Sequence, residues 1–150
     1  MTVRKTLELF TKYNINFQML TKGGSKAKRD FDLYKKGDAF ASTLTFVDEE
    51  KSKEWEVNAS SPNDRMETLK FAHSMGIETW VSLEPVIEPS ESLKIIELTH
   101  EFVDLYKIGI LNYNELSKTL DCKDFGTKAI KLLEKYNKKY YIKDDLKKYL

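Results

Sequence analysis

Four short apolar or β-branched runs, each followed by a stretch with helical spacing, constrain the fold of this chain more than any other feature. The runs are Leu20-Thr21-Lys22, Thr43-Leu44-Thr45, Trp80-Val81-Ser82-Leu83-Glu84 and Leu105-Tyr106-Lys107-Ile108-Gly109. Strands that alternate with helices at this spacing are typical of right-handed βαβ crossovers and a parallel sheet. The sequence therefore predicts an α/β fold.

Polar and apolar residues alternate along these runs, and alternate residues of a strand point to opposite faces of a sheet. The polar set expected on one face is Lys22, Thr43, Thr45, Trp80, Ser82, Glu84 and Lys107. The apolar set expected on the other is Met19, Leu44, Phe46, Val81, Leu83, Tyr106 and Ile108. A doubly wound sheet is covered on both faces, so its central strands would be almost entirely apolar. We therefore expect a partial parallel β/α barrel, a half barrel of four or five strands with helices on its convex face, because so few units cannot close a barrel of eight.

Turn and capping signals place the remaining elements. Helices are expected over 2–13, 25–36 and 61–75, from Ser90 onward, near Leu116, over 125–136 and as a turn over 144–149. Strands are expected over 17–21, 39–46, 78–83, 103–108 and 140–142. Ser61 and Ser90 are the expected N-caps, Gly37 and Gly76 the expected helix ends, and 47–60 an unusually long polar connection.

Composition limits the function classes. The 150 residues fit one domain, and 25 Lys plus Arg against 24 Asp plus Glu leave a net charge of +1, which gives no global field for nucleic acid or an anionic membrane. Cys122 is the only cysteine, so this chain alone builds neither a disulfide nor a multi-thiolate metal site. No apolar stretch approaches about 18 residues, and the N-terminus lacks a secretory signal. The expected location is the cytoplasm.

Several segments in a fixed order carry a resemblance to a known family. They are Leu20-Thr21-Lys22-Gly23, Thr43-Leu44-Thr45-Phe46, Ala59 through Arg65 with Thr68-Leu69, Thr79 through Val86, and Tyr106-Lys107-Ile108-Gly109 before Asn112-Tyr113. Together they resemble the C-terminal part of radical S-adenosylmethionine proteins, in particular the DNA repair photolyase-like group related to spore photoproduct lyase. The likeness spans about residues 3–145.

The resemblance implies a partial (β/α) barrel of six strands, a [4Fe–4S] cluster held by a C-x3-C-x2-C loop, and S-adenosylmethionine bound at that cluster. A single cysteine, Cys122, cannot supply that loop. The resemblance therefore implies that residues 1–150 are the C-terminal portion of such a barrel, lacking the N-terminal part that binds the cluster. It assigns no catalytic residue and no metal ligand in this chain.

The same resemblance implies cofactor-binding roles for Lys22, Thr43, Thr45, Ser82, Glu84 and Lys107. Lys22 matches the lysine that contacts the carboxylate of S-adenosylmethionine in spore photoproduct lyase-like proteins, and a surface lysine on a glycine loop is the alternative. Glu84 either binds a ligand or pairs structurally with Lys107. Trp80 either stacks on adenine or fills the barrel. The threonine hydroxyls either bond the ligand or belong to ordinary strand residues.

The preferred function is the S-adenosylmethionine-facing half of a radical enzyme, which in the complete protein cleaves the cofactor reductively to a 5′-deoxyadenosyl radical. This chain alone is expected to be inactive. The alternatives are a standalone binding module for a small anionic metabolite and an inert remnant. Two open sheet edges predict self-association or association with the missing N-terminal half. Nucleic acid is implied as a partner only by the family, without support from charge, and no membrane is expected.

Overall fold

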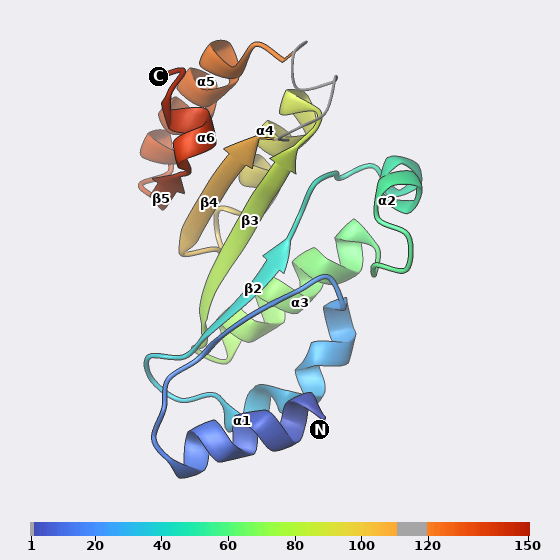
Figure 1. Cartoon of the computed structure of the whole chain (residues 1–150), viewed down its shortest axis with the longest axis vertical. Helices are drawn as coiled ribbons and strands as arrows, with labels where there is room; N and C mark the ends of the chain where they lie inside the picture. Colours follow the sequence, from blue (N-terminus) through green and yellow to red (C-terminus); the bar gives the residue numbers. More distant parts are fainter. Residues whose placement is uncertain (1, 111–119) are drawn as a thin grey trace.

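The protein contains one open sheet of parallel strands in the order β1-β2-β3-β4-β5 (Figure 1). The computed structural model describes residues 2–110 and 120–150. The strands are β1 (Gln18–Thr21), β2 (Ala39–Thr43), β3 (Glu78–Val86), β4 (Leu105–Ile110) and β5 (Lys139–Ile142). Because spatial order follows chain order, each strand lies beside its predecessor, as in successive units of a β/α barrel.

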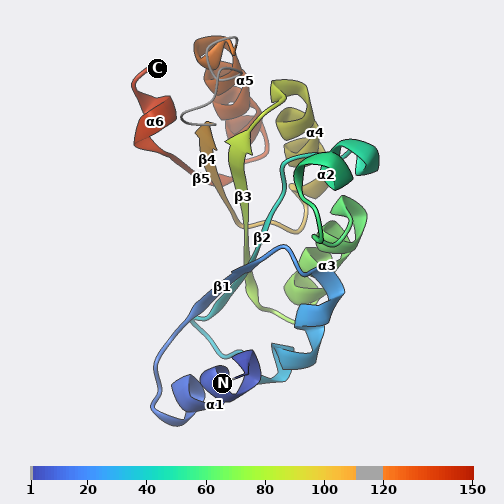
Figure 2. The ribbon, with the colours of Figure 1, turned by 45° about the vertical axis from the view of Figure 1, so that its right-hand side comes forward.

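Helices connect successive strands and pack against the sheet. They are α1 (Val3–Lys12), the 3₁₀ helix η1 (Gly24–Leu33), α2 (Glu49–Trp55), α3 (Pro62–Ser74), α4 (Pro89–Thr99), α5 (Cys122–Lys135) and α6 (Asp144–Lys147). Helix α3 packs on β2 and β3, α4 on β3, and α5 on α4 and β5. Figure 2 shows α2, α3 and α4 together on one side of the strands. In the described part of the chain, no helix combines the length and apolarity that crossing a lipid bilayer requires.

The main hydrophobic core lies between the sheet and these helices. Its strand side chains include Phe40, Leu44, Val81, Leu83 and Tyr106, which are all fully buried. A separate, smaller cluster of Ala39, Ala41 and Trp80, with Leu105 against it, lies on the opposite face. The two clusters use alternate residues of the same strands, so the predicted two-faced alternation is confirmed.

The predicted fold class is confirmed: an α/β protein with one parallel sheet. The start of α3 follows the predicted chemistry, because Ser61 Oγ accepts a hydrogen bond from the backbone N–H of Asp64 (3.2 Å) and Pro62 is the first helical residue. The helix ends before Gly76, which has a φ of +79°. Short strand β5 also lies where it was predicted.

Other predicted boundaries are wrong. The connection 47–60 contains helix α2, whose N-cap Asp48 accepts from the N–H groups of Glu50 and Lys51. The helix predicted to reach Gly37 is instead η1 and ends at Leu33. Helix α4 begins at Pro89 after N-cap Glu88, so Ser90 is not its cap.

Smaller corrections concern strand lengths and one side chain. Strand β2 ends at Thr43 rather than Phe46, and β3 continues through Pro85 to Val86. Leu98, predicted on the buried side of its helix, is half-exposed. The helix predicted near Leu116 lies outside the described residues, as do Asn112 and Tyr113.

Candidate functional site

A groove of about 560 Å³ lies on the sheet face opposite the main core. We call it the inner groove. Four strands and the residue that follows β5 contribute its lining: Leu20, Trp80, Ser82, Glu84, Leu105, Lys107, Tyr141 and Lys143. Its walls nearer the amino ends of the strands are apolar, and its side nearer the carboxyl ends is polar. Ligands of open parallel sheets bind beyond the carboxyl ends of the strands, so this polar side is the candidate site.

The strand register aligns three of the predicted polar residues in one row. Thr43 pairs with Ser82, and Ser82 pairs with Lys107. Neighbouring strands lie about 4.8 Å apart, so these side chains share one face at close spacing. The sequence prediction that they line one surface is therefore confirmed for this row.

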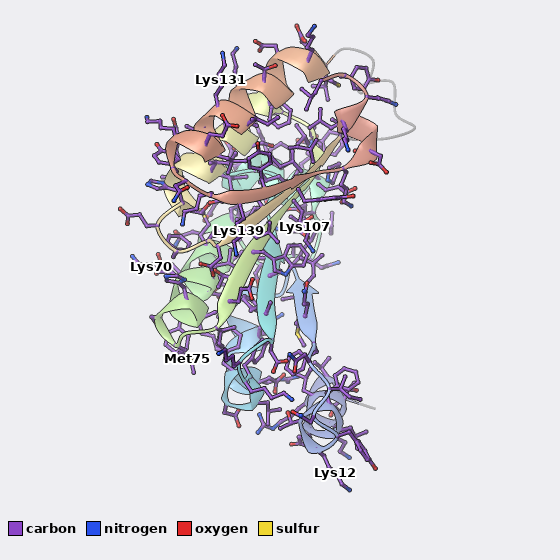
Figure 3. The ribbon with its side chains drawn as sticks, turned by 90° about the vertical axis from the view of Figure 1, so that its left-hand side faces the viewer. Lys12, Lys70, Met75, Lys107, Lys131 and Lys139 are labelled. Carbon is purple, nitrogen blue, oxygen red and sulfur yellow. The ribbon has the colours of Figure 1, made fainter. Side chains whose placement is uncertain are left out.

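Lys107 turns away from the row and lies on Trp80. Its Nζ is 3.7 Å from the centroid of the Trp80 ring, a cation–π contact. Lys107 and Lys139 rise from neighbouring strands in the middle of the molecule (Figure 3). The Trp80 side chain is buried, and its Nε1–H has no hydrogen-bond partner among the described residues. Trp80 therefore fills the interior of the sheet face and also leaves one polar donor unsatisfied.

Glu84 forms an ion pair with Lys143, the residue that follows β5, and not with Lys107 as predicted. The two side chains meet above Gly109 of the intervening strand. A Cβ at Gly109 would lie 3.1 Å from Glu84 Oε1 and 3.0 Å from Lys143 Cδ, so glycine leaves the room for this contact. The sequence alone pointed to Lys107 because Lys143 lies beyond the end of β5, a strand of only four residues.

Lys22 lies at a second location, away from the inner groove. Its Nζ is 2.9 Å from Oε1 of Glu56, a buried carboxylate that follows α2. Glu56 also accepts hydrogen bonds from Thr45 Oγ1 (3.2 Å) and Ser52 Oγ (3.1 Å). We call Lys22, Thr45, Ser52, Glu56 and Arg65 the strand-end cluster. The expectation that Lys22 and Glu84 converge in one trough is therefore wrong, because Glu56 holds Lys22 outside the inner groove.

Arg65 of α3 completes the strand-end cluster from a fully buried position (0% exposed). Its Nη1 donates to the backbone oxygen of Thr43 (2.9 Å), and its Nη2 donates to Ser52 Oγ (2.8 Å) and Glu56 Oε2 (2.6 Å). Arg65 therefore connects the start of α3 to β2 and to the segment around α2. Burial by itself would raise the pKa of Glu56, but the hydrogen bonds from Arg65 and Lys22 outweigh it and hold that pKa below its usual value.

The two predicted threonines differ in their surroundings. Thr43 is buried in the row beside Ser82, where its hydroxyl has no partner among the described residues. Thr45 lies beyond the end of β2, and its hydroxyl is committed to Glu56. Thr45 therefore belongs to the strand-end cluster rather than to the polar row.

The cysteine and the two histidines, residue types that often serve in catalysis or metal binding, lie outside both locations. Cys122 begins α5 and is buried, and burial raises the pKa of its thiol. His73 is 3.8 Å from Asp104, and His100 stacks on Tyr136. Within 2–110 and 120–150, no three Asp, Glu, His or Cys side chains are grouped as metal ligands would be. A three-cysteine cluster does not fit the single thiol of this sequence.

Three solved structures of other proteins superpose on this chain. SuiB from Streptococcus suis, solved bound to S-adenosylmethionine, superposes with a TM-score of 0.72 and 12% identity over 93% of this chain and 36% of its own. Spore photoproduct lyase, solved with bound S-adenosylmethionine and dinucleoside spore photoproduct, gives 0.70 and 10% over 93% of this chain and 54% of its own. A domain of pyruvate-formate lyase-activating enzyme from Bacteroides vulgatus gives 0.68 and 16% over 94% and 89%.

SuiB and spore photoproduct lyase were both solved with S-adenosylmethionine bound. This chain has their partial-barrel fold. It spans about a third of the length of SuiB and about half of spore photoproduct lyase. No model of a known protein family and no curated protein matches the sequence. The resemblance noted from the sequence is therefore confirmed at the level of the fold.

Proposed function

We propose that residues 1–150 form the S-adenosylmethionine-facing C-terminal portion of a radical S-adenosylmethionine barrel, acting in the cytoplasm. The observation that supports this proposal is the pair of hydroxyl residues Thr43 and Ser82, which lie side by side on β2 and β3 of a fold that superposes on enzymes solved with that cofactor. The residues present fit an amino-acid cofactor, because two hydroxyls and a carboxylate lie on the neighbouring strands β2 and β3, and Lys22 follows β1 on the other side of β2.

Each side chain has a role that its chemistry supports. The Lys22 ammonium, half-exposed beside Glu56, binds the cofactor carboxylate. Thr43 and Ser82 offer hydroxyls to its amino and ribose groups. Glu84, fixed by Lys143, presents an oriented carboxylate at the rim of the inner groove. Thr45 stays out of this set, and its role is to hold Glu56.

In this superfamily, S-adenosylmethionine supplies a carbon radical after one-electron reduction. The reducing cluster requires three thiolates, whereas this chain contains one cysteine. The residues described here bind and orient; they do not carry electrons. The proposed division of labour is therefore that cysteines outside residues 1–150 hold the cluster and this portion holds the cofactor. We expect the chain by itself to be catalytically inactive.

Equilibrium binding of S-adenosylmethionine to the purified chain tests the proposal. We expect saturable binding by isothermal titration calorimetry, weakened at least tenfold in Lys22→Ala because one charge-assisted contact is lost. Lys26→Ala is the matched control, since Lys26 is exposed on the same glycine-rich segment. Absence of binding, or equal loss in both variants, would reject this function.

The alternative of a standalone module is distinguished by the ligand preference in the same titration. S-adenosylhomocysteine, which has the same amino-acid end but no sulfonium, should bind through the same Lys22. If neither compound binds while another small anion does, the binding-module interpretation replaces the radical barrel.

A further inference from the structure

The amino-end half of the inner groove contains donors without acceptors. Lys107 Nζ has no carboxylate within ion-pair distance among residues 2–110 and 120–150. Glu84 lines the same groove, but it forms its ion pair with Lys143. Trp80 Nε1–H is buried and unpartnered. Lys107 is part-buried and contacts an aromatic ring but no anion, so a negatively charged oxygen is the complementary partner for its ammonium group.

The walls around these donors are apolar. Leu20 and Tyr141 are about half-exposed, at 47% and 53%, and both line the groove from the two edge strands. Leu105 lies between them and packs on the Ala39–Ala41–Trp80 cluster. A ligand that satisfies Lys107 is therefore surrounded by hydrocarbon rather than by further charges.

We propose that this half of the inner groove binds a small organic carboxylate with an apolar body. The carboxylate pairs with Lys107 after the flexible lysine shifts off the Trp80 ring, and the body lies against Leu20, Leu105 and Tyr141. The choice of an anion follows from charge complementarity, since the only carboxylate in the lining is already neutralised by its own lysine. The apolar body follows from the walls.

The site shares the inner groove with Ser82 and Glu84 of the proposed cofactor site but is formed by other side chains, Lys107 and Trp80 with Leu20, Leu105 and Tyr141. Trp80 and Leu105 pair across one register position, and Ser82 with Lys107 across the next toward the carboxyl ends. Binding of the carboxylate does not require S-adenosylmethionine. Only the further step, that such carboxylates are the substrate class of the barrel, rests on the proposed function.

Tryptophan fluorescence tests the site directly. Trp55 and Trp80 are the two tryptophans, and Trp55 is the exposed last residue of α2, so Trp55→Phe leaves Trp80 as the only reporter. In this background, hexanoate should change the Trp80 emission saturably. Hexanamide, which keeps the body and the carbonyl without the charge, should bind at least tenfold more weakly, and acetate should produce no saturable change up to the same concentration.

Substitution of the lysine provides the second arm. Lys107→Met keeps a long stem and removes the charge, and should weaken hexanoate binding at least tenfold, whereas Lys107→Arg should retain it. Lys139→Met, on the neighbouring strand outside the groove lining, should leave binding unchanged. The Trp80 indole N–H resonance reports independently, because its chemical shift should change when Lys107 leaves the ring to pair with the carboxylate.

Equal affinity for hexanoate and hexanamide, or unchanged binding in Lys107→Met with a native circular dichroism spectrum, overturns the proposal. If Lys107→Met fails to fold, hexanoate against hexanamide in the Trp55→Phe protein still decides the question. Hexanoate binding without S-adenosylmethionine binding would reject the proposed function alone. The reverse result would reject only this inference.

Discussion

At the scale of single residues, the buried pair of Arg65 and Glu56 is the most consequential feature. Arg65 links three elements: it bonds the last residue of β2, Ser52 in α2 and the carboxylate after α2. A buried ion pair adds little net stability compared with an apolar pair, but removing one partner leaves an uncompensated charge. The cluster therefore fixes the segment around α2 and, through Glu56, the position of Lys22.

We expect Arg65→Met to lower the free energy of unfolding by about 3–5 kcal/mol, because Glu56 would remain buried with only Lys22 as a counter-charge. Urea denaturation measures this change. Arg29→Met is the control, since Arg29 is exposed and its pair with Asp30 should contribute less than about 1 kcal/mol. A loss in Arg65→Met no larger than in the control would show that the pair is not structurally coupled.

The lowered pKa of Glu56 gives a pH dependence with a defined sign. The folded pKa lies below the unfolded value of 4.5, so the contribution of Glu56 to stability is complete above that value and is lost as the pH falls through the folded pKa. In Glu56→Gln, the free energy of unfolding should therefore fall less steeply as the pH is lowered from about 5. Thermal unfolding across this range measures it, and identical pH profiles for the two proteins would contradict the argument.

At the scale of secondary-structure elements, two serines that look equivalent in sequence behave differently. Ser61 precedes a proline and caps α3, whereas Ser90 follows Pro89 and lies inside the first turn of α4. Both adjoin a proline and have an acidic residue in the first helical turn, Asp64 in α3 and Glu91 in α4, and the position of the proline separates them. Proline is favoured at the first helical position, so the cap is the residue before it.

Ser61→Ala should cost about 1 kcal/mol of stability, because the backbone N–H of Asp64 loses its acceptor. Ser90→Ala, at a position without a capping bond, should change stability by less than about 0.5 kcal/mol. Chemical denaturation of the two variants compares them directly. A larger loss in Ser90→Ala would mean that Ser90 is the cap and that α4 begins two residues later than described.

At the scale of the whole molecule, the sheet has two open edges. Strand β1 pairs only with β2, and β5 pairs only with β4, in the part of the chain that the structure describes. Leu20 and Tyr141, the exposed apolar residues of these edges, lie on the uncovered face. Unpaired strand edges beside exposed apolar groups favour association with another chain.

We expect the purified chain to associate with increasing concentration, measured by light scattering coupled to size-exclusion chromatography. Tyr141→Lys should shift the distribution toward monomer, because a charge on an edge strand opposes pairing. Tyr149→Lys, at an exposed tyrosine outside the sheet, is the control. A stable monomer at all concentrations would argue against an interrupted barrel.

Much of the fold could be read from local pattern. The period-two alternation predicted the strands and assigned Val81, Leu83, Tyr106 and Ile108 to the core face, and the Ser61-Pro62 pair predicted the start of α3. Helix α2 was missed because its sequence is polar on nearly every side. Its cap at Asp48 is the signal that could have revealed it.

The candidate site, too, could be predicted from the sequence only in part. Alternation and strand order by themselves determined that Ser82 and Lys107 share a face, because backbone geometry fixes side-chain direction every second residue. Only the tertiary structure decided that Glu84 pairs with Lys143, 59 residues away, and that Glu56 holds Lys22. Ion pairing depends on which side chains the folded chain brings within a few ångströms, and that distance is set by packing between elements rather than by any local period.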